Sequence, residues 1–385
     1  MGKKIRTDTI HLGVEPDNHY GSINDPIYKN STLVFQNYKS FLDAKKDRFN
    51  VPYYGRISTY TTRRFEKLCS KLYNAKKAVI TSSGLSAITI TFLALLKKDD
   101  EILISENCYE PVYNFTTNEL KKFGIKSRFF SNNLKEIDKS INSKTKILYI
   151  ESPGSLNYEV LEIEKIVKLC KTRNIITIMD NTWSTFLGHN PLKIGVNIVI
   201  ESLTKYFSGH SDNFLGLIAL NSLQLAKTIK TTSVRLGDYV SSESCFQAAK
   251  GLKTLKLRIE KHSENADKVF NYLKTKKIVK NILYLPDQRN KFHNLWKKYH
   301  KHNNGLITFS IQKIKNMSFF IDKLNLFKIG FSWGGYESLI IPVNNLKPTK
   351  KVSKKNKFWF RIHVGLESPS DLINDLEKAF RNYEN

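Results

Sequence analysis

A lysine with two hydroxyl side chains just before it is the clearest sign of chemistry in this sequence. Lys205 follows the apolar run 197–200, and Ser202 and Thr204 stand three residues and one residue before it. A lysine so placed can form a Schiff base through its amine, and the hydroxyls can hydrogen-bond a phosphate. Because the chain is rich in lysine, this interpretation depends on what accompanies Lys205.

Two further features accompany it. Asp180 ends the apolar run 175–179, 25 residues before Lys205. A carboxylate there can hold a ring nitrogen protonated, although a solvent-facing aspartate at a strand end is common. The turn Ser83-Gly84-Leu85 offers backbone N–H groups that suit a phosphate, or is an ordinary turn with a serine N-cap. The spacing of the aspartate and the lysine favours a shared site over chance.

The elements that must position these residues alternate between short apolar runs and helical patterns. We expect strands at 78–80, 101–104, 146–150, 175–179 and 197–200, and helices at 86–96 and 163–171. Strands that alternate with helices predict an α/β fold with a mainly parallel sheet covered on both faces. Ligands of such sheets bind at the carboxyl ends of the strands, where Asp180 and Lys205 are expected.

The chain of 385 residues is long enough for two domains and an arm. Residues 1–57 have no strong hydrophobic period and are interpreted as an N-terminal arm. Residues 58–253 are expected to form the cofactor-binding domain, and 254–385 a smaller C-terminal α+β domain. Helical patterns at 252–274 and 371–382 are assigned to the connection between them and to the C-terminus.

The formal net charge of +27 raises the question of a nucleic-acid partner. The lysines are spread along the whole chain, and the densest segment, 347–357, is interpreted as a solvated loop without interleaved aromatic residues. We therefore expect no specific nucleic-acid partner.

No metal site is expected either. The four cysteines form no CxxC pair, and His300 and His302 are assigned to a charged loop. The N-terminus has no apolar stretch of a secretory signal, and the longest apolar run, 88–96, is too short to span a membrane. These features favour a cytoplasmic protein with free thiols and no membrane association.

The stretch from Ser202 to Asp212 has the pattern Ser-x-Thr-Lys-Tyr-x-x-Gly-His-Ser-Asp. It resembles the cofactor-lysine signature of the Cys/Met metabolism PLP-dependent enzymes, and the resemblance extends from about Tyr28 to the C-terminus. It implies the type I PLP-dependent transferase (aspartate aminotransferase-like) fold, pyridoxal 5′-phosphate (PLP) as cofactor, and an amino acid as substrate. It also implies a homo-oligomer, expected to be a homotetramer built from two dimers that share active sites.

The resemblance assigns a role to each matching residue. It places the cofactor on Lys205, the pyridine nitrogen against Asp180, a stacking ring at Tyr109 and the substrate α-carboxylate at Arg361. Planar arginine suits a carboxylate better than lysine does. The phosphate is assigned to the set Ser83, Gly84, Leu85, Ser202 and Thr204, with Tyr54 and Arg56 reaching it from the neighbouring subunit.

Other motifs narrow the expected reaction. Ser332 and Trp333, in the segment 331–339, and the segments 109–111 and 151–156 resemble the cystathionine β-lyase branch of the family. This implies cleavage of L-cystathionine to homocysteine, pyruvate and ammonia. Asn114 and Phe331 depart from some members of that branch, which leaves the substrate preference open. The alternatives are a γ-acting relative, such as a cystathionine γ-synthase or γ-lyase, and a non-enzymatic regulator that keeps the fold.

Overall fold

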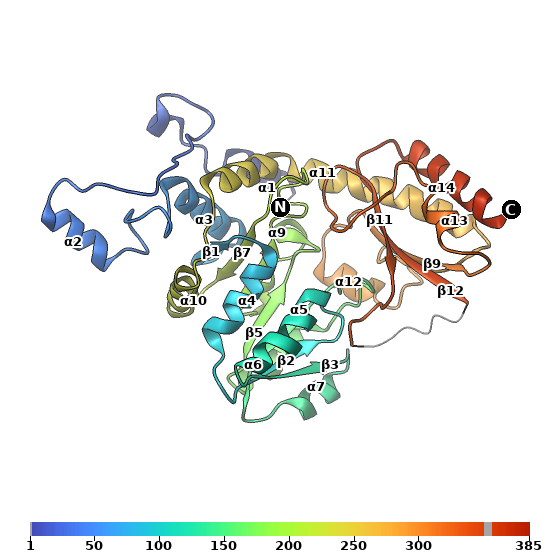
Figure 1. Ribbon diagram of the computed structural model, residues 1–385, viewed down its shortest axis with the longest axis horizontal. Helices are drawn as coiled ribbons and strands as arrows, with labels where there is room; N and C mark the ends of the chain where they lie inside the picture. Colours follow the sequence, from blue (N-terminus) through green and yellow to red (C-terminus); the bar gives the residue numbers. More distant parts are fainter. Residues whose placement is uncertain (1, 350–355) are drawn as a thin grey trace.

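Two β-sheets organise the computed structural model, which describes residues 2–349 and 356–385 (Figure 1). The larger sheet has seven strands in the order β1-β7-β6-β5-β4-β2-β3, and the smaller has five in the order β10-β11-β12-β9-β8. The strands of the larger sheet are β1 (Lys77–Thr81), β2 (Glu101–Ser105), β3 (Lys126–Phe130), β4 (Thr145–Glu151), β5 (Ile176–Asp180), β6 (Ile198–Ser202) and β7 (Gly216–Leu220).

The strands of the larger sheet are parallel apart from β7, which is antiparallel to both β1 and β6. The expected mainly parallel sheet is therefore confirmed, and β7 is a strand that the sequence analysis did not identify. Since β1 and β6 run in the same direction on either side of β7, their carboxyl ends meet at one edge with those of β4 and β5.

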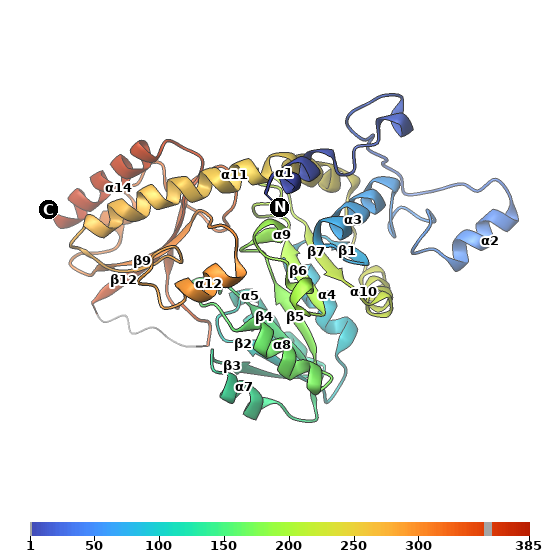
Figure 2. The ribbon, with the colours of Figure 1, turned by 180° about the vertical axis from the view of Figure 1, so that it is seen from behind.

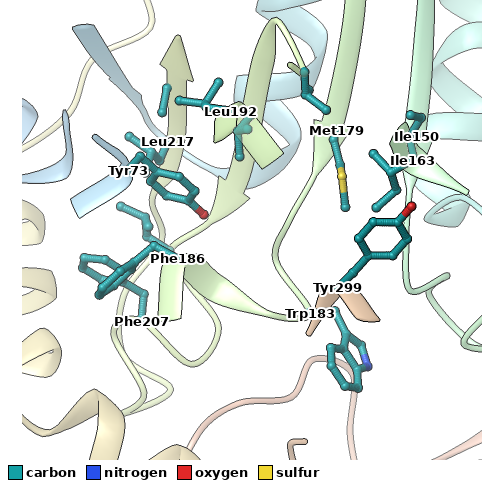
Figure 3. Close-up of a cluster of buried hydrophobic side chains, with 14 of the residues drawn as sticks. Tyr73, Ile150, Ile163, Met179, Trp183, Phe186, Leu192, Phe207, Leu217 and Tyr299 are labelled. Atoms are coloured by element: carbon teal, nitrogen blue, oxygen red, sulfur yellow. The ribbon is translucent and has the colours of Figure 1, made fainter. Parts of the chain in front are cut away.

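Helices cover both faces of this sheet, and α8 comes to the front in the rear view (Figure 2). In β4, Ile147 and Tyr149 face the cluster that includes α4, whereas Leu148 and Ile150 face the cluster that includes α3 and α8. Figure 3 shows part of this second cluster. Burial on both faces explains why the strands are apolar without alternation. The helices of this region are α3 (Tyr60–Tyr73), α4 (Gly84–Leu95), α5 (Glu110–Asn114), α6 (Leu120–Lys122), α7 (Leu134–Ser140), α8 (Ile163–Thr172), α9 (Thr185–Gly188) and α10 (Leu223–Arg235).

The long helix α11 (Ser242–Thr275) runs from the larger sheet to the smaller one (Figures 1 and 2). It begins ten residues before the helix expected at 252–274, because Ser241 caps it by accepting the N–H of Ser244. The expected boundary near residue 253 falls inside α11, so the division into 58–253 and 254–385 stays a proposal. The remaining elements are β8 (Val279–Leu283), α12 (His293–Tyr299), β9 (Leu306–Gln312), α13 (Ser318–Ile321), β10 (Lys328–Ile329), β11 (Leu339–Val343), β12 (Lys357–His363) and α14 (Pro369–Glu384).

The N-terminal arm is anchored at its beginning and projects farther along. Lys253 on α11 donates from Nζ to the carbonyl oxygens of Ile10 (2.8 Å) and Leu12 (3.2 Å), next to α1 (Gly2–His11). Helix α2 (Tyr38–Lys46) stands away from the body of the chain (Figure 1). Val34 just before it is 92% exposed.

The structure changes two assignments made from the sequence. His300 does lie in a loop, but its side chain is buried. Lys347 is likewise mostly buried, and its Nζ forms ion pairs with Glu106 (2.6 Å) and Glu159 (2.8 Å), while residues 350–355 of the same segment lie outside the described residues. In the described chain, no helix is both long and apolar enough to cross a membrane.

Candidate active site

The carboxyl edge of the larger sheet brings together residues that are far apart in sequence. Glu151, Asp180 and Ser202 are the last residues of β4, β5 and β6, which are neighbours in the sheet. Lys205 lies in the turn that follows β6. Parallel strands thus place two carboxylates, a hydroxyl and an amine at one edge, as the sequence analysis expected for Asp180 and Lys205.

The amine of Lys205 is enclosed by the smaller domain. Its Nζ donates to Ser332 Oγ at 2.6 Å and lies 5.6 Å from the ring centroid of Trp333. Burial lowers the pKa of Lys205 to about 8; the positive charge of Arg361 acts in the same direction, and Asp180 opposes it. A lysine with such a pKa supplies neutral amine near neutral pH, which a nucleophile or a base requires.

Asp180 is held in place by its neighbours. Its Oδ1 accepts the N–H of Thr182 at 2.8 Å, and its Oδ2 accepts the hydroxyl of Tyr149 at 3.4 Å. Burial raises the pKa of Asp180, and the hydrogen bonds from Thr182 and Tyr149 partly offset that effect. A half-buried carboxylate held by neutral donors is suited to a cationic N–H partner.

The start of α4 forms a close junction with the end of β6. A Cβ atom on Gly84 would lie 2.5 Å from Ser202 Cβ, so only glycine allows this approach. The side chain of Ser83 caps the helix by accepting the N–H of Ser86 at 3.0 Å. The turn therefore offers the backbone N–H groups of the first helical turn to an anion, beside the hydroxyl of Ser202.

Thr204 has a contact that the sequence did not suggest. Its Oγ1 accepts the N–H of Leu215 at 3.1 Å and lies 3.4 Å from the carbonyl oxygen of the same residue. The hydroxyl therefore ties the lysine turn to the start of β7. A phosphate contact from Thr204 would share this hydroxyl with the backbone.

Tyr109 and Arg361 approach from different domains. The backbone N–H of Tyr109 donates to Glu151 Oε2 at 2.6 Å, and Tyr109 itself is 44% exposed and so partly shielded from water. Burial raises the pKa of Tyr109, and the charge of Glu151 adds to the effect. Arg361 is 7% exposed, and its Nη2 donates to the carbonyl oxygen of Ser332 at 3.1 Å.

Sequence reasoning gave no role to Glu151 or Tyr149, although both contact assigned residues. Glu151 anchors the backbone of Tyr109, and Tyr149 bonds to Asp180. The available signal was the strand-end position of Glu151, at the same edge as Asp180. Tyr149 gave no signal, because its strand appears uniformly apolar.

Tyr54 and Arg56 do not join the lysine edge within one chain. Arg56 Nη1 donates to the carbonyl oxygen of Val234 at the end of α10 (2.7 Å), and the Tyr54 side chain is 42% exposed. Neither has a hydrogen bond to Lys205 in the described part of the chain. The expectation that they serve a neighbouring subunit stays a prediction.

Histidines do gather in one buried place, but without metal-binding geometry. The rings of His189 and His300 are 5.1 Å apart between centroids, and Ser184 Oγ lies 2.6 Å from His300 Nδ1. Within residues 2–349 and 356–385, no group of three His, Cys, Asp or Glu side chains is arranged to hold a metal ion.

Comparison with known proteins shows the family to which this chain belongs. The family model of the Cys/Met metabolism PLP-dependent enzymes matches residues 6–381. The L-alanine/L-glutamate racemase of Wolbachia pipientis is 32% identical over 96% of this chain and 95% of its own length, and the cystathionine β-lyase of Bordetella avium is 30% identical over 98% and 97%. The solved cystathionine γ-lyase of Lactobacillus plantarum has a TM-score of 0.89 at 27% identity, covering 99% of each chain.

The chain belongs to the Cys/Met metabolism PLP-dependent enzyme family, and its cofactor is PLP. The residues present fit that group. Gly84 leaves room where any Cβ would meet Ser202, the α4 terminus offers N–H donors, Asp180 is a half-buried acceptor, and Lys205 supplies the amine. Bound PLP supplies an electron sink for carbanions formed next to the amino group of a substrate.

Proposed function

We propose that the chain is a carbon–sulfur β-lyase that cleaves L-cystathionine to homocysteine, pyruvate and ammonia. The observation that carries the proposal is the position of Trp333. Its ring lies 5.6 Å from Lys205 Nζ and 5.4 Å from the ring of Tyr206, and the residue before it, Ser332, accepts a hydrogen bond from Arg361. A tryptophan here gives a broad apolar wall to a long substrate, and its π face suits a distal ammonium group.

Each assigned residue then has a separate role in this reaction. Lys205 would hold the cofactor, and its Nζ would remove the Cα proton of the substrate. Asp180 would keep the ring nitrogen protonated. The first turn of α4, with Ser202 and Thr204, would hold the phosphate, and the ring of Tyr109 would lie against the cofactor.

Arg361 orients the substrate for this proton transfer. A guanidinium can bind the α-carboxylate through two parallel hydrogen bonds, which fixes the direction of the Cα–H bond. Arg361 is well placed because its charge already acts on both Lys205 and Tyr109. Lys205, or a nearby tyrosine, then returns a proton to the departing thiolate.

A product assay tests the proposal. Purified protein with added PLP is given L-cystathionine, and 2-oxo acids and thiols are identified. Pyruvate with homocysteine is the expected result. Formation of 2-oxobutanoate with cysteine would instead identify a γ-lyase, and absence of turnover with every sulfur amino acid would favour a synthase or a non-enzymatic regulator.

A second candidate is amino-acid racemisation, because the relative with 32% identity is a racemase of alanine and glutamate. Racemisation uses the same first step, proton removal from Cα, and then returns a proton to the opposite face. Incubation with L-alanine distinguishes the two activities. D-alanine without pyruvate would indicate a racemase, whereas pyruvate from cystathionine and no D-alanine would indicate the lyase.

The complete active site is proposed to need a second subunit. Tyr54 is exposed, and within the described residues the hydrogen bond of the Arg56 side chain goes to the backbone carbonyl of Val234. In the proposed homo-oligomer both residues reach the cofactor phosphate of the neighbouring subunit, in a tetramer built from two such dimers.

A further inference from the structure

One buried histidine outside the assigned set contacts the loop that covers Lys205. We propose that His363 is a positioning residue that fixes the loop 332–337 against the lysine turn, and thereby sets the environment of the Lys205 amine. The proposal rests on the assignment of Lys205 as the cofactor lysine, and it holds whether the substrate is cystathionine or another amino acid.

The first observation is that both nitrogens of His363 bind this loop. His363 Nε2 accepts the N–H of Gly334 at 3.1 Å, and Nδ1 lies 3.0 Å from the carbonyl oxygen of Glu337. Because Nε2 accepts, the proton is on Nδ1, which donates to that carbonyl. His363 is 1% exposed, and burial keeps its pKa well below the usual range, so the ring stays neutral and retains this tautomer.

The second observation is how closely the loop approaches the lysine. A Cβ on Gly334 would lie 2.6 Å from Tyr206 N and 2.9 Å from the carbonyl carbon of Lys205, and its φ is +87°. Gly334 therefore touches the backbone of the cofactor lysine at a point that only glycine can occupy. The hydrogen bond from the Gly334 N–H to His363 therefore also stabilises this contact.

The third observation is that the loop needs external support. Ser332 has φ of +86°, an unfavourable conformation for a residue with a Cβ. Its Oγ accepts from Lys205 Nζ, and its carbonyl oxygen accepts from Arg361. Arg361 and His363 are two residues apart on β12, so their side chains point to the same face of that strand. They bind the loop at two points.

The test compares His363→Phe with His262→Phe. Both histidines are buried in ring contact with each other (5.0 Å between centroids), but His262 bonds through Nδ1 to the carbonyl oxygen of Val364 and has no hydrogen bond to the loop. Phenylalanine keeps the ring packing and removes the hydrogen bonds. A third variant, His363→Gln, keeps one acceptor and one donor near the loop.

The readout is the labelling rate of Lys205 by acetic anhydride as a function of pH, measured by peptide mass spectrometry in cofactor-free protein. Wild-type Lys205 should titrate near pH 8. Release of the loop would hydrate the amine, so His363→Phe should move the midpoint up by half a unit or more, towards 10.5, with His363→Gln in between and His262→Phe unchanged. This readout needs no substrate, so it is independent of the lyase assay.

Two results would overturn the proposal. One is an unchanged midpoint in folded His363→Phe. The other is an equal shift in His262→Phe, which would make the effect a general consequence of disturbing the buried histidines. If His363→Phe does not fold, His363→Leu, which also removes both hydrogen bonds, decides: a midpoint identical to wild type in the folded variant would reject the positioning role.

Discussion

The lysine edge and the N-terminal arm differ in what holds their functional residues. Lys205, Asp180 and Arg361 are enclosed by two domains of one chain, with hydrogen bonds on each of them. Tyr54 and Arg56 lie in an arm whose helix α2 stands away from the body (Figure 1). One subunit therefore positions the residues near the Lys205 amine by itself. The contacts of the arm with the cofactor phosphate are proposed to form only when two subunits associate.

Among the variants that test this comparison, loss of Lys205 should have the largest effect on activity. Lys205→Ala should abolish the visible absorbance of lysine-bound cofactor and lower turnover by more than about 1,000-fold, because both the cofactor attachment and the base are removed. Absorbance spectra and a 2-oxo-acid assay measure the two losses. Full activity in this variant would show that the lysine assignment is wrong.

Loss of the arm contact should have a smaller effect that another subunit can repair. Arg56→Ala should weaken PLP retention by about 10- to 100-fold, as expected for removal of one charged phosphate contact. The measurement is cofactor release during dialysis. Wild-type retention in a confirmed oligomer would separate Arg56 from the phosphate.

Mixing Arg56→Ala with Lys205→Ala subunits tests directly whether the active site is shared between subunits. A mixed dimer contains one site with both residues intact if the site is shared between subunits, and some activity should return. Subunit exchange is verified with differently tagged chains. Confirmed exchange without recovered activity would mean that each chain builds its own site.

Trp333→Ala should have a moderate and substrate-dependent effect. The loss of a wall and a π face should cost about 1–2 kcal/mol in the KM for cystathionine. Cysteine lacks the distal half and should be affected less, so the comparison of kcat/KM for the two substrates is the measurement. Equal losses would assign Trp333 to packing against Tyr206 and would remove the main support for a β-lyase.

The last expected effect is on stability and not on catalysis, and it concerns a buried histidine, His189. Burial lowers the pKa of His189 to about 4 from 6.5, so between pH 6.5 and 4 the unfolded chain binds a proton that the folded chain does not. Stability should fall as the pH falls through this window. His189→Asn should reduce the acid-induced loss by about 1–3 kcal/mol, measured by denaturant unfolding at pH 7 and pH 4.5.

Two neighbours modify the effect of burial on His189. A hydrogen bond to the backbone of Tyr299 raises the pKa of His189, and the charge of Lys301 lowers it. The ring of His300 packs 5.1 Å away. The matched control is His293→Asn, because His293 is partly exposed in α12. An equal change in both variants would contradict a specific effect of burial at His189.

Much of the lysine edge could be predicted from the sequence, because local patterns carry it. Apolar runs ended at Asp180 and shortly before Lys205, and the parallel-sheet rule then predicted a common edge. The reversal of β7 could not be predicted, since direction in a sheet depends on pairing between distant segments. The burial of His300 and Lys347 was missed for the same reason: their partners, Ser184 and Glu106, lie far away in the sequence.

The sequence by itself determined the family, the cofactor and the chemical types available at the site. Residue identity and spacing specify these, because a Schiff base needs an amine and a phosphate suits a glycine turn at a helix start. Only the tertiary structure decided the environment of each group. The pKa of Lys205 depends on burial and on the distances from Lys205 to Arg361 and Asp180. The hydrogen bonds between His363 and the loop 332–337 depend on the packing of β12 beside the turn that carries Lys205, about 160 residues earlier in the chain. Such long-range contacts arise when the domains pack together, which local sequence patterns do not encode.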